Sequence, residues 1–332
     1  MGGNVGVSRL KELHDAVLAE LGRRIVGQVE PMEQVLTCFF TGGHCLIMGM
    51  PGVAKTLLVN SLAQAMDLSF KRIQFTPDLM PSDITGTEIL EEDRATGRRE
   101  LKFVPGPVFA NIVMADEINR TPPKTQAALL ESMQERQVTI GGKTYPLPKP
   151  VFVLATQIPI EQEGTYPLPE AQQDRFMFNV RMTYLSEDEE VAAVQQSAMG
   201  KPVQLRTILK GEELLAYQQQ IRSLPLPDRL LGYIVDLVAG SRPGKTAPDF
   251  VNEYVAWGAG LRASQYIALG AKSRAALSGR EDMTLEDVRA VILPVMRHRI
   301  GLNFRAEVDK VSVEDVIGRL VKHQPAPTVG AR

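Results

Sequence analysis

The feature that most limits how this chain can fold is Gly49–Thr56 (GMPGVAKT), which directly follows the short apolar run His44–Met48. A strand, a glycine-bearing loop and the start of a helix would direct backbone N–H groups at an anion. In that arrangement the Lys55 ammonium reaches the β- and γ-phosphates of a nucleotide, and the Thr56 hydroxyl ligates Mg²⁺. Ala54 stands where the pattern usually has glycine, and its small side chain still lets the loop close. The alternative is a chance Gly-Pro turn before a helix.

A second signal is the acidic pair Asp116-Glu117, which follows the apolar run Asn111–Ala115. Two acids at the end of a buried strand are costly unless a cation or a reaction uses them. Asp116 is placed to hold Mg²⁺, and Glu117 is placed to polarise an attacking water as general base. Taken alone, the pair also fits a strand that simply ends in solvated acids.

Hydrolysis of a nucleotide also requires positive charge at the γ-phosphate, and an arginine finger there contributes about 10³ to 10⁵ in rate. The sequence offers two candidates. Arg175 precedes a predicted strand, and Arg262 lies at the start of a helix in the second half of the chain. Spacing alone favours reading each as a surface arginine paired with an acid.

The apolar runs predict the fold class. His44–Met48, Asn111–Ala115 and Val151–Ala155 have strand length, and the last two fit strands buried on both faces of a parallel sheet. The first two precede helical segments, which gives a βα alternation and an α/β fold. Two polar hairpins lie between them, at Gly86–Phe103 with a turn at Thr96-Gly97, and at Gln137–Leu147.

After Tyr184 the pattern becomes helical. Capping-box pairs begin three segments, and no buried strand is evident, so a smaller all-helical domain is expected. The predicted division is residues 1–184 for the α/β domain, 185–323 for the helical domain and 324–332 for a disordered tail. The charged run Arg297–Arg299 could bind an acidic partner, but a solvated helix end is the favoured interpretation.

Composition excludes several classes of protein. The 332 residues suggest about two domains, and 44% hydrophobic with 23% charged residues is ordinary for a globular chain. No apolar run reaches the ~20 residues of a membrane helix. Two cysteines, Cys38 and Cys45, favour a reducing cytoplasm over a disulfide framework. The net charge of −2 makes a nucleic-acid motor the least favoured reading, because nucleic-acid binders are usually basic.

Beyond these local signals, most of the chain, from about Leu10 to about Leu320, resembles the MoxR group of AAA+ ATPases. The resemblance is carried by the phosphate loop, in which Ala54 is typical of the family, and by Phe75–Leu79, Pro105–Pro107, Met114–Arg120, Pro122–Glu131, Met133–Thr139 and Glu161–Gln172. It implies a P-loop NTPase core, a three-layer αβα parallel sheet with hairpin insertions, followed by a small helical lid that closes over ATP.

The resemblance also implies residue roles. Val26-Gly27-Gln28 resembles the segment that lines the adenine pocket, and ATP with Mg²⁺ would bind the phosphate loop through Gly49, Pro51, Gly52, Val53, Ala54, Lys55, Thr56 and Leu57. Arg175 corresponds to the arginine finger, which acts on ATP in the neighbouring subunit. Arg262 corresponds to the sensor-2 arginine, which contacts the γ-phosphate from the lid. The two hairpins correspond to insertions that face a pore or a partner.

Members of this family usually form hexameric rings. They are thought to act as chaperones, often with a von Willebrand factor A domain protein, in the maturation of client complexes. A cytoplasmic, ring-forming ATPase is therefore expected.

One position departs from the family pattern. Relatives usually have asparagine, the sensor-1 residue, where this chain has Ile158 within ATQIP. The segment Gly258–Leu261 before Arg262 also differs from the usual Ser-Pro. We therefore expect retained ATP binding with weakened or partner-dependent hydrolysis, and a nucleotide-gated scaffold without useful turnover is the main alternative.

Overall fold

A computed structural model describes residues 6–92, 99–158, 164–198 and 203–327. The predicted turn at Thr96-Gly97, the motif residues Glu161–Glu163 and the tail residues 328–332 lie outside the described part of the chain.

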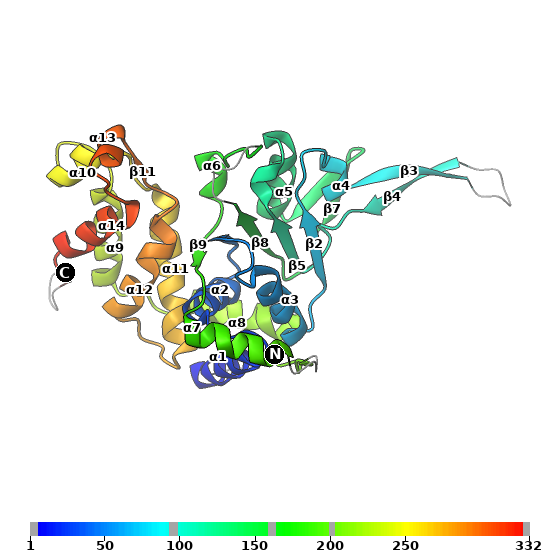
Figure 1. The fold of residues 1–332 in the computed structure, drawn as a ribbon, viewed down its shortest axis with the longest axis horizontal. Helices are drawn as coiled ribbons and strands as arrows, with labels where there is room; N and C mark the ends of the chain where they lie inside the picture. The colour runs from blue at the N-terminus through cyan, green and yellow to red at the C-terminus, as the bar shows by residue number, and fades with distance from the viewer. Residues whose placement is uncertain (1–5, 93–98, 159–163, 199–202, 328–332) are drawn as a thin grey trace.

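The centre of the molecule is a parallel sheet, as predicted, and it has five strands (Figure 1). The prediction of three strands is confirmed to within two residues at each end, and the strand expected after Arg175 is present. In spatial order the strands are β2 (Phe70–Gln74), β5 (Ile112–Asp116), β8 (Phe152–Gln157), β1 (Cys45–Gly49) and β9 (Phe178–Met182).

Both faces of the sheet are covered by helices, because successive side chains of a strand point to opposite faces and both sets are apolar here. Ile112 and Met114 pack in one buried cluster, and Val113 and Ala115 pack in the other. The helices on the first face are α1 (Val7–Gly22), α2 (Val29–Thr41) and α3 (Lys55–Ala65), and those on the second are α4 (Pro81–Thr85) and α5 (Pro123–Glu135). The result is the expected three-layer αβα core.

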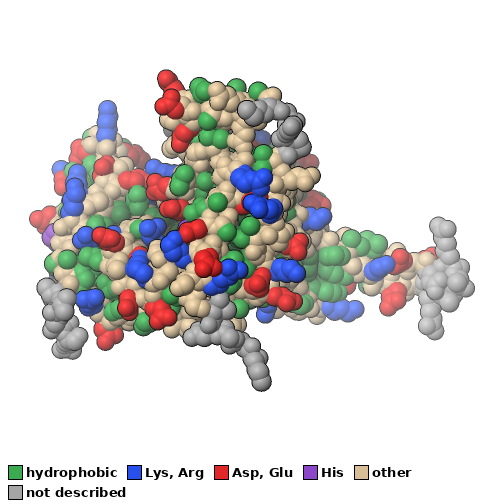
Figure 2. Space-filling view, turned by 90° about the horizontal axis from the view of Figure 1, so that it is seen from below, with side chains coloured by type: hydrophobic (Ala, Val, Ile, Leu, Met, Phe, Trp, Pro, Cys, Tyr) green, Lys and Arg blue, Asp and Glu red, His purple; other side chains and the backbone are tan. Residues whose placement is uncertain are grey.

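The two predicted hairpins are present. β3 (Gly86–Glu92) pairs with β4 (Arg99–Pro105), and β6 (Gln137–Ile140) pairs with β7 (Lys143–Pro146). The first hairpin projects far from the body (Figure 1). Hydrophobic side chains gather along it where it leaves the body (Figure 2), and Leu90 and Leu101, which face each other across its strands, are 60% and 58% exposed. Short helices η1 (Ile118–Arg120) and α6 (Glu170–Gln173) complete this half.

The rest of the described chain is helical apart from one short ribbon. Its helices are α7 (Glu187–Ala198), α8 (Gly211–Ser223), α9 (Asp228–Gly240), α10 (Asp249–Tyr254), α11 (Leu261–Leu277), α12 (Leu285–Met296), α13 (Phe304–Val308) and α14 (Val313–His323). The expectation of no strand here is corrected only by the antiparallel pair β10 (Val255–Trp257) and β11 (Gly301–Leu302). The capping boxes of α12 and α14 are formed as predicted.

The helical part is not a separate body, since α11 and α8 both contact α2 and their buried side chains join the cluster on the first face of the sheet. Within the described ranges, no helix combines the length and the apolar character that a membrane crossing requires.

Candidate nucleotide site

The phosphate loop lies between β1 and α3, where the sequence places it. Two of its residues, Gly52 and Ala54, take positive φ angles of 87° and 64°. The loop therefore closes with Ala54 in the left-handed region, as expected for a small side chain. Gly49 is required for a different reason, because a Cβ there would lie 2.6 Å from the carbonyl oxygen of Met182 on the adjacent strand β9.

The loop presents donors to an anion. Among the residues that the structure describes, no side chain caps the N-terminus of α3, so its first backbone N–H groups lack the side-chain partner that a helix start usually has. Lys55 Nζ donates to the carbonyl oxygen of Gly49 at 2.7 Å, which holds the ammonium against the loop. Burial lowers the pKa of Lys55, while the charges of Asp116 and Glu117 act in the opposite direction.

The acidic pair is held by residues of the neighbouring strands. Asp116 is buried at the end of β5, where its Oδ1 accepts from Thr156 Oγ1 at 2.7 Å. Its Oδ2 accepts from Arg72 Nε and Nη2 at 3.0 and 2.5 Å. The Thr156 hydroxyl also accepts from the backbone N–H of Glu117 at 2.8 Å. One buried hydroxyl on β8 therefore fixes both acids relative to each other.

Glu117 has its own polar contacts. Its backbone is left-handed, with φ of 57°, and its Oε2 accepts from Gln74 Nε2 at 3.1 Å and pairs with Arg120 Nη1 at 3.2 Å. Sequence reasoning missed Arg72, Gln74 and Thr156, because they come from strands distant in the chain. The one available signal was the position of these polar residues within the strands β2 and β8. That signal does not show which side chain each of them contacts.

The segment expected at the adenine pocket lies beside the loop. Val26 and Gln28 line a cavity of about 300 Å³ together with Gly52, Val53 and Ala54, and α7 forms another wall. Gln28 Nε2 donates to the carbonyl oxygen of Thr183 at 2.6 Å, which ties the segment to the end of β9. The structure thus brings together the residues that the resemblance assigned to nucleotide binding.

Arg175 and Arg262 lie together at the opposite end of the sheet from Lys55. They line a cavity of about 240 Å³ with Arg136, Arg222 and the segment 41–44. The segment 41–44 precedes β1, whereas the phosphate loop follows β1. The five residues of β1 span about 15 Å, so this distance separates the cavity from the loop. Arg262, which was expected to contact a γ-phosphate from the lid, therefore lies at the opposite end of the sheet from the chain's own phosphate loop.

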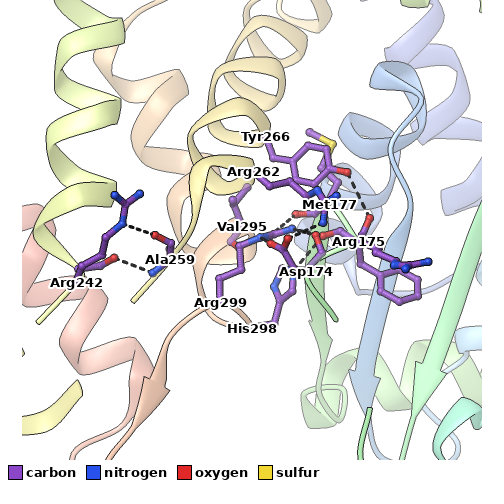
Figure 3. Close-up of polar contacts among 12 residues, drawn as sticks. Asp174, Arg175, Met177, Arg242, Ala259, Arg262, Tyr266, Val295, His298 and Arg299 are labelled. Atoms are coloured by element: carbon purple, nitrogen blue, oxygen red, sulfur yellow. Dashed lines mark hydrogen bonds and ion pairs between the residues drawn. The ribbon is translucent and has the colours of Figure 1, made fainter. Parts of the chain in front are cut away.

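A shared carboxylate holds this end together (Figure 3). Arg262 Nη1 donates to Asp174 Oδ2 at 2.6 Å, and Arg299 Nε donates to Asp174 Oδ1 at 2.7 Å. Arg175 Nη1 donates to the carbonyl oxygen of Leu130 at 3.0 Å, near the end of α5. The solvated helix end expected at Arg297–Arg299 is also a wrong prediction, because Arg299 is 2% exposed and Arg297 only 7%.

Arg297 instead faces the nucleotide end of the sheet. It lines a cavity of about 450 Å³ with Gln28, Arg181 and Glu314, and burial lowers its pKa. Its neighbour Glu314 pairs with Arg181 at 2.7 Å. The Arg181–Glu314 ion pair therefore joins the lid to the nucleotide end of the sheet, and the sequence did not indicate this pair.

Ile158 leaves β8 beside Asn119. Its backbone N–H donates to Asn119 Oδ1 at 3.1 Å, and its carbonyl oxygen accepts from Asn119 Nδ2 at 2.9 Å. The side chain is 4% exposed and has no atom that can donate or accept a hydrogen bond. Asn119 thus anchors the main chain at Ile158, and the Ile158 side chain offers no polar group.

Comparisons with known proteins show which family the chain resembles. Residues 44–178 match the model of the ATPase family associated with various cellular activities, and residues 249–320 match the AAA lid domain. The chain is 43% identical to the chaperone MoxR1 of Mycobacterium tuberculosis, over 99% of this chain and 86% of that one. It is 30% identical to the protein MoxR of Methylorubrum extorquens, over 93% of each. A crystal structure of a candidate ATPase from Cytophaga hutchinsonii superposes with a TM-score of 0.89 at 42% identity, covering 97% of both chains.

Proposed function

The chain belongs to the MoxR group of the AAA+ ATPases, and we propose that it binds ATP with Mg²⁺ at Gly49–Thr56 and hydrolyses it between two neighbouring copies. One observation carries this proposal. Lys55, Asp116 and Glu117 lie at the carboxyl end of the sheet, whereas Arg175 and Arg262 line a cavity at its amino end. A single copy cannot bring both sets to one phosphate, but two copies in head-to-tail contact can.

The residues at the carboxyl end suit a magnesium nucleotide. Thr56 and Asp116 would supply one hydroxyl and one carboxylate, and two protein ligands are enough because Mg²⁺ keeps several waters and substrate oxygens. The ion supplies charge neutralisation on the phosphates. Lys55 would hold the terminal phosphates, and Glu117 would take the proton of the attacking water, with Gln74 orienting its carboxylate.

The neighbouring copy would contribute the positive charge. Arg175 and Arg262 line the same cavity, so we assign both to the γ-phosphate of the adjacent copy rather than one to each nucleotide. Fixed cations at that point stabilise the charge that develops as the terminal bond breaks. Head-to-tail contacts that close generate a ring, and a hexamer is the expected form.

In the cell, the protein would act as a chaperone-like remodeller of partner complexes. This part of the proposal is supported by the similarity to a relative named as a chaperone. The exposed β3–β4 ribbon suits contact with a client or with a von Willebrand factor A domain partner. The two cysteines, both free and buried, agree with a reducing cytoplasm.

Two variants test nucleotide binding and hydrolysis separately. Calorimetry should detect ATP binding by the wild type and at least a tenfold loss in Lys55→Ala. Glu117→Gln should bind ATP as the wild type does while losing turnover. If folded wild-type protein has no affinity for adenine nucleotides, or if Lys55→Ala binds equally well, the proposal is wrong.

A nucleotide-gated scaffold is the second candidate, and the apolar Ile158 favours it. Without a polar side chain at that position, the attacking water lacks one orienting partner. Single-turnover hydrolysis separates the two candidates. A wild-type rate equal to that of Glu117→Gln would identify a scaffold, and a rate well above it would identify an enzyme.

A further inference from the structure

We propose that Arg299 is a positioning residue that holds the segment Asp174–Met177 and thereby sets where Arg175 and Arg262 meet the nucleotide of the adjacent copy. This inference rests on the proposed intersubunit site. Arg299 itself is 2% exposed and does not line the cavity that Arg175 and Arg262 share, so it cannot touch a phosphate bound there. Its effect would pass through the segment that it holds.

All five N–H donors of the Arg299 guanidinium are used. Nε donates to Asp174 Oδ1, and Nη2 donates to the carbonyl oxygens of Asp174 and Phe176. Nη1 donates to the carbonyl oxygens of Met177 and Val295. Four of these five bonds end on the segment 174–177, and the fifth ties the guanidinium to its own helix α12. Because every N–H donor of this buried guanidinium has an acceptor, these bonds favour one geometry of the segment.

The lid binds every carbonyl of this segment. Besides the bonds from Arg299, Tyr266 Oη donates to the carbonyl oxygen of Arg175 at 3.3 Å. His298 Nε2 lies 3.0 Å from the carbonyl oxygen of Phe176, and the Tyr266 ring lies 5.1 Å from the Arg299 guanidinium carbon. The segment connects α6 to β9, and its backbone N–H groups donate to carbonyl oxygens of α6 and of His44. Contacts with the lid therefore hold the carbonyl side of the backbone at Arg175, while α6 and His44 hold its N–H side.

The Asp174 carboxylate extends the same control to Arg262. Its Oδ1 accepts from Arg299 and its Oδ2 accepts from Arg262 (Figure 3). A change in the Arg299 contact would therefore displace both candidate fingers. Lysine cannot replace Arg299, because an ammonium keeps the charge but has three donors and no planar fork.

Mixed-subunit assays on the full chain test the proposal. Arg299→Lys should lower kcat at least tenfold while ATP affinity, measured by calorimetry, and KM change less than twofold. Mixing it with Lys55→Ala, which has an inactive site of its own but intact fingers, should restore activity. Asp174→Asn should behave in the same way. Arg280→Lys is the control, since Arg280 makes two bonds to the carboxylate of Asp287 and does not line the cavity of Arg175 and Arg262, so it should leave turnover unchanged.

Arg175→Ala mixed with Lys55→Ala tells the possible failures apart. If that mixture is inactive, the intersubunit site itself is wrong, and the role of Arg299 falls with it. If that mixture is active, three results overturn only the present inference. The first is wild-type turnover in Arg299→Lys. The second is a defect in Arg299→Lys that Lys55→Ala does not restore. The third is a defect that includes loss of ATP binding, as general unfolding would cause.

Discussion

Replacing Thr156 by valine tests the arrangement of the two acids most directly. The Thr156 side chain is fully buried, and valine matches its shape while removing the hydroxyl. The change deletes the bond to Asp116 Oδ1 at 2.7 Å and leaves the Glu117 N–H without the acceptor at 2.8 Å. It adds no cavity, so the loss of polar contacts can be measured alone.

The expected magnitude follows from these two bonds. A hydrogen bond to a charged group contributes about 1.5–3 kcal/mol, and a donor left without a partner costs about 1–3 kcal/mol. Arg72 still neutralises Asp116 through Oδ2, so the lower part of each range applies and the sum is about 3 kcal/mol. At about 2 °C per kcal/mol for a chain of this size, the melting temperature should fall by ~6 °C.

Scanning calorimetry of Thr156→Val, Thr156→Ser and Thr139→Val checks this reasoning. Thr156→Ser keeps the hydroxyl and should lose only about 1 kcal/mol for a buried methyl group. Thr139 bonds Thr144 on the exposed β6–β7 hairpin, so Thr139→Val should change stability by less than about 0.5 kcal/mol. ATP turnover should also fall more than ATP affinity in Thr156→Val. Equal melting temperatures for Thr156→Val and the wild type would refute the assigned role of the hydroxyl.

Three further outcomes are expected. Ile158→Asn should raise the steady-state turnover of purified protein several-fold, and an unchanged rate would count against a missing sensor. Burial lowers the pKa of His44 from 6.5 to about 3, so the unfolded chain binds more protons between these values. Stability should fall as pH drops below about 6.5, by up to about 1.4 kcal/mol for each pH unit. His44→Asn, which keeps an acceptor for the Val153 N–H, should flatten this slope in melting curves, and an equally steep slope would contradict the assignment. Arg72→Gln should bind Mg²⁺ more tightly in magnesium titrations of ATP binding, since Asp116 Oδ2 loses its competing cation; an unchanged midpoint would rule out such competition.

The features that could be predicted are those whose signal is continuous along the chain. Gly49–Thr56 could be identified because a strand, a loop and a helix start follow one another without interruption. The acids at the end of β5, both hairpins and the capping boxes are local patterns of the same kind. The uninterrupted apolar run from Ile112 to Ala115 also anticipated a sheet covered on both faces, because successive side chains of a strand point to opposite faces.

The positions of Arg262 and Arg297–Arg299 required the tertiary structure. A charged run such as Arg-His-Arg indicates a solvated helix end, since burying a cation is costly without partners. For Arg299 these partners are the Asp174 carboxylate and carbonyls of the segment 174–177, more than a hundred residues earlier in the chain. No local sequence pattern indicates that contact. Which phosphate each arginine can reach therefore depends on how the lid packs against the sheet.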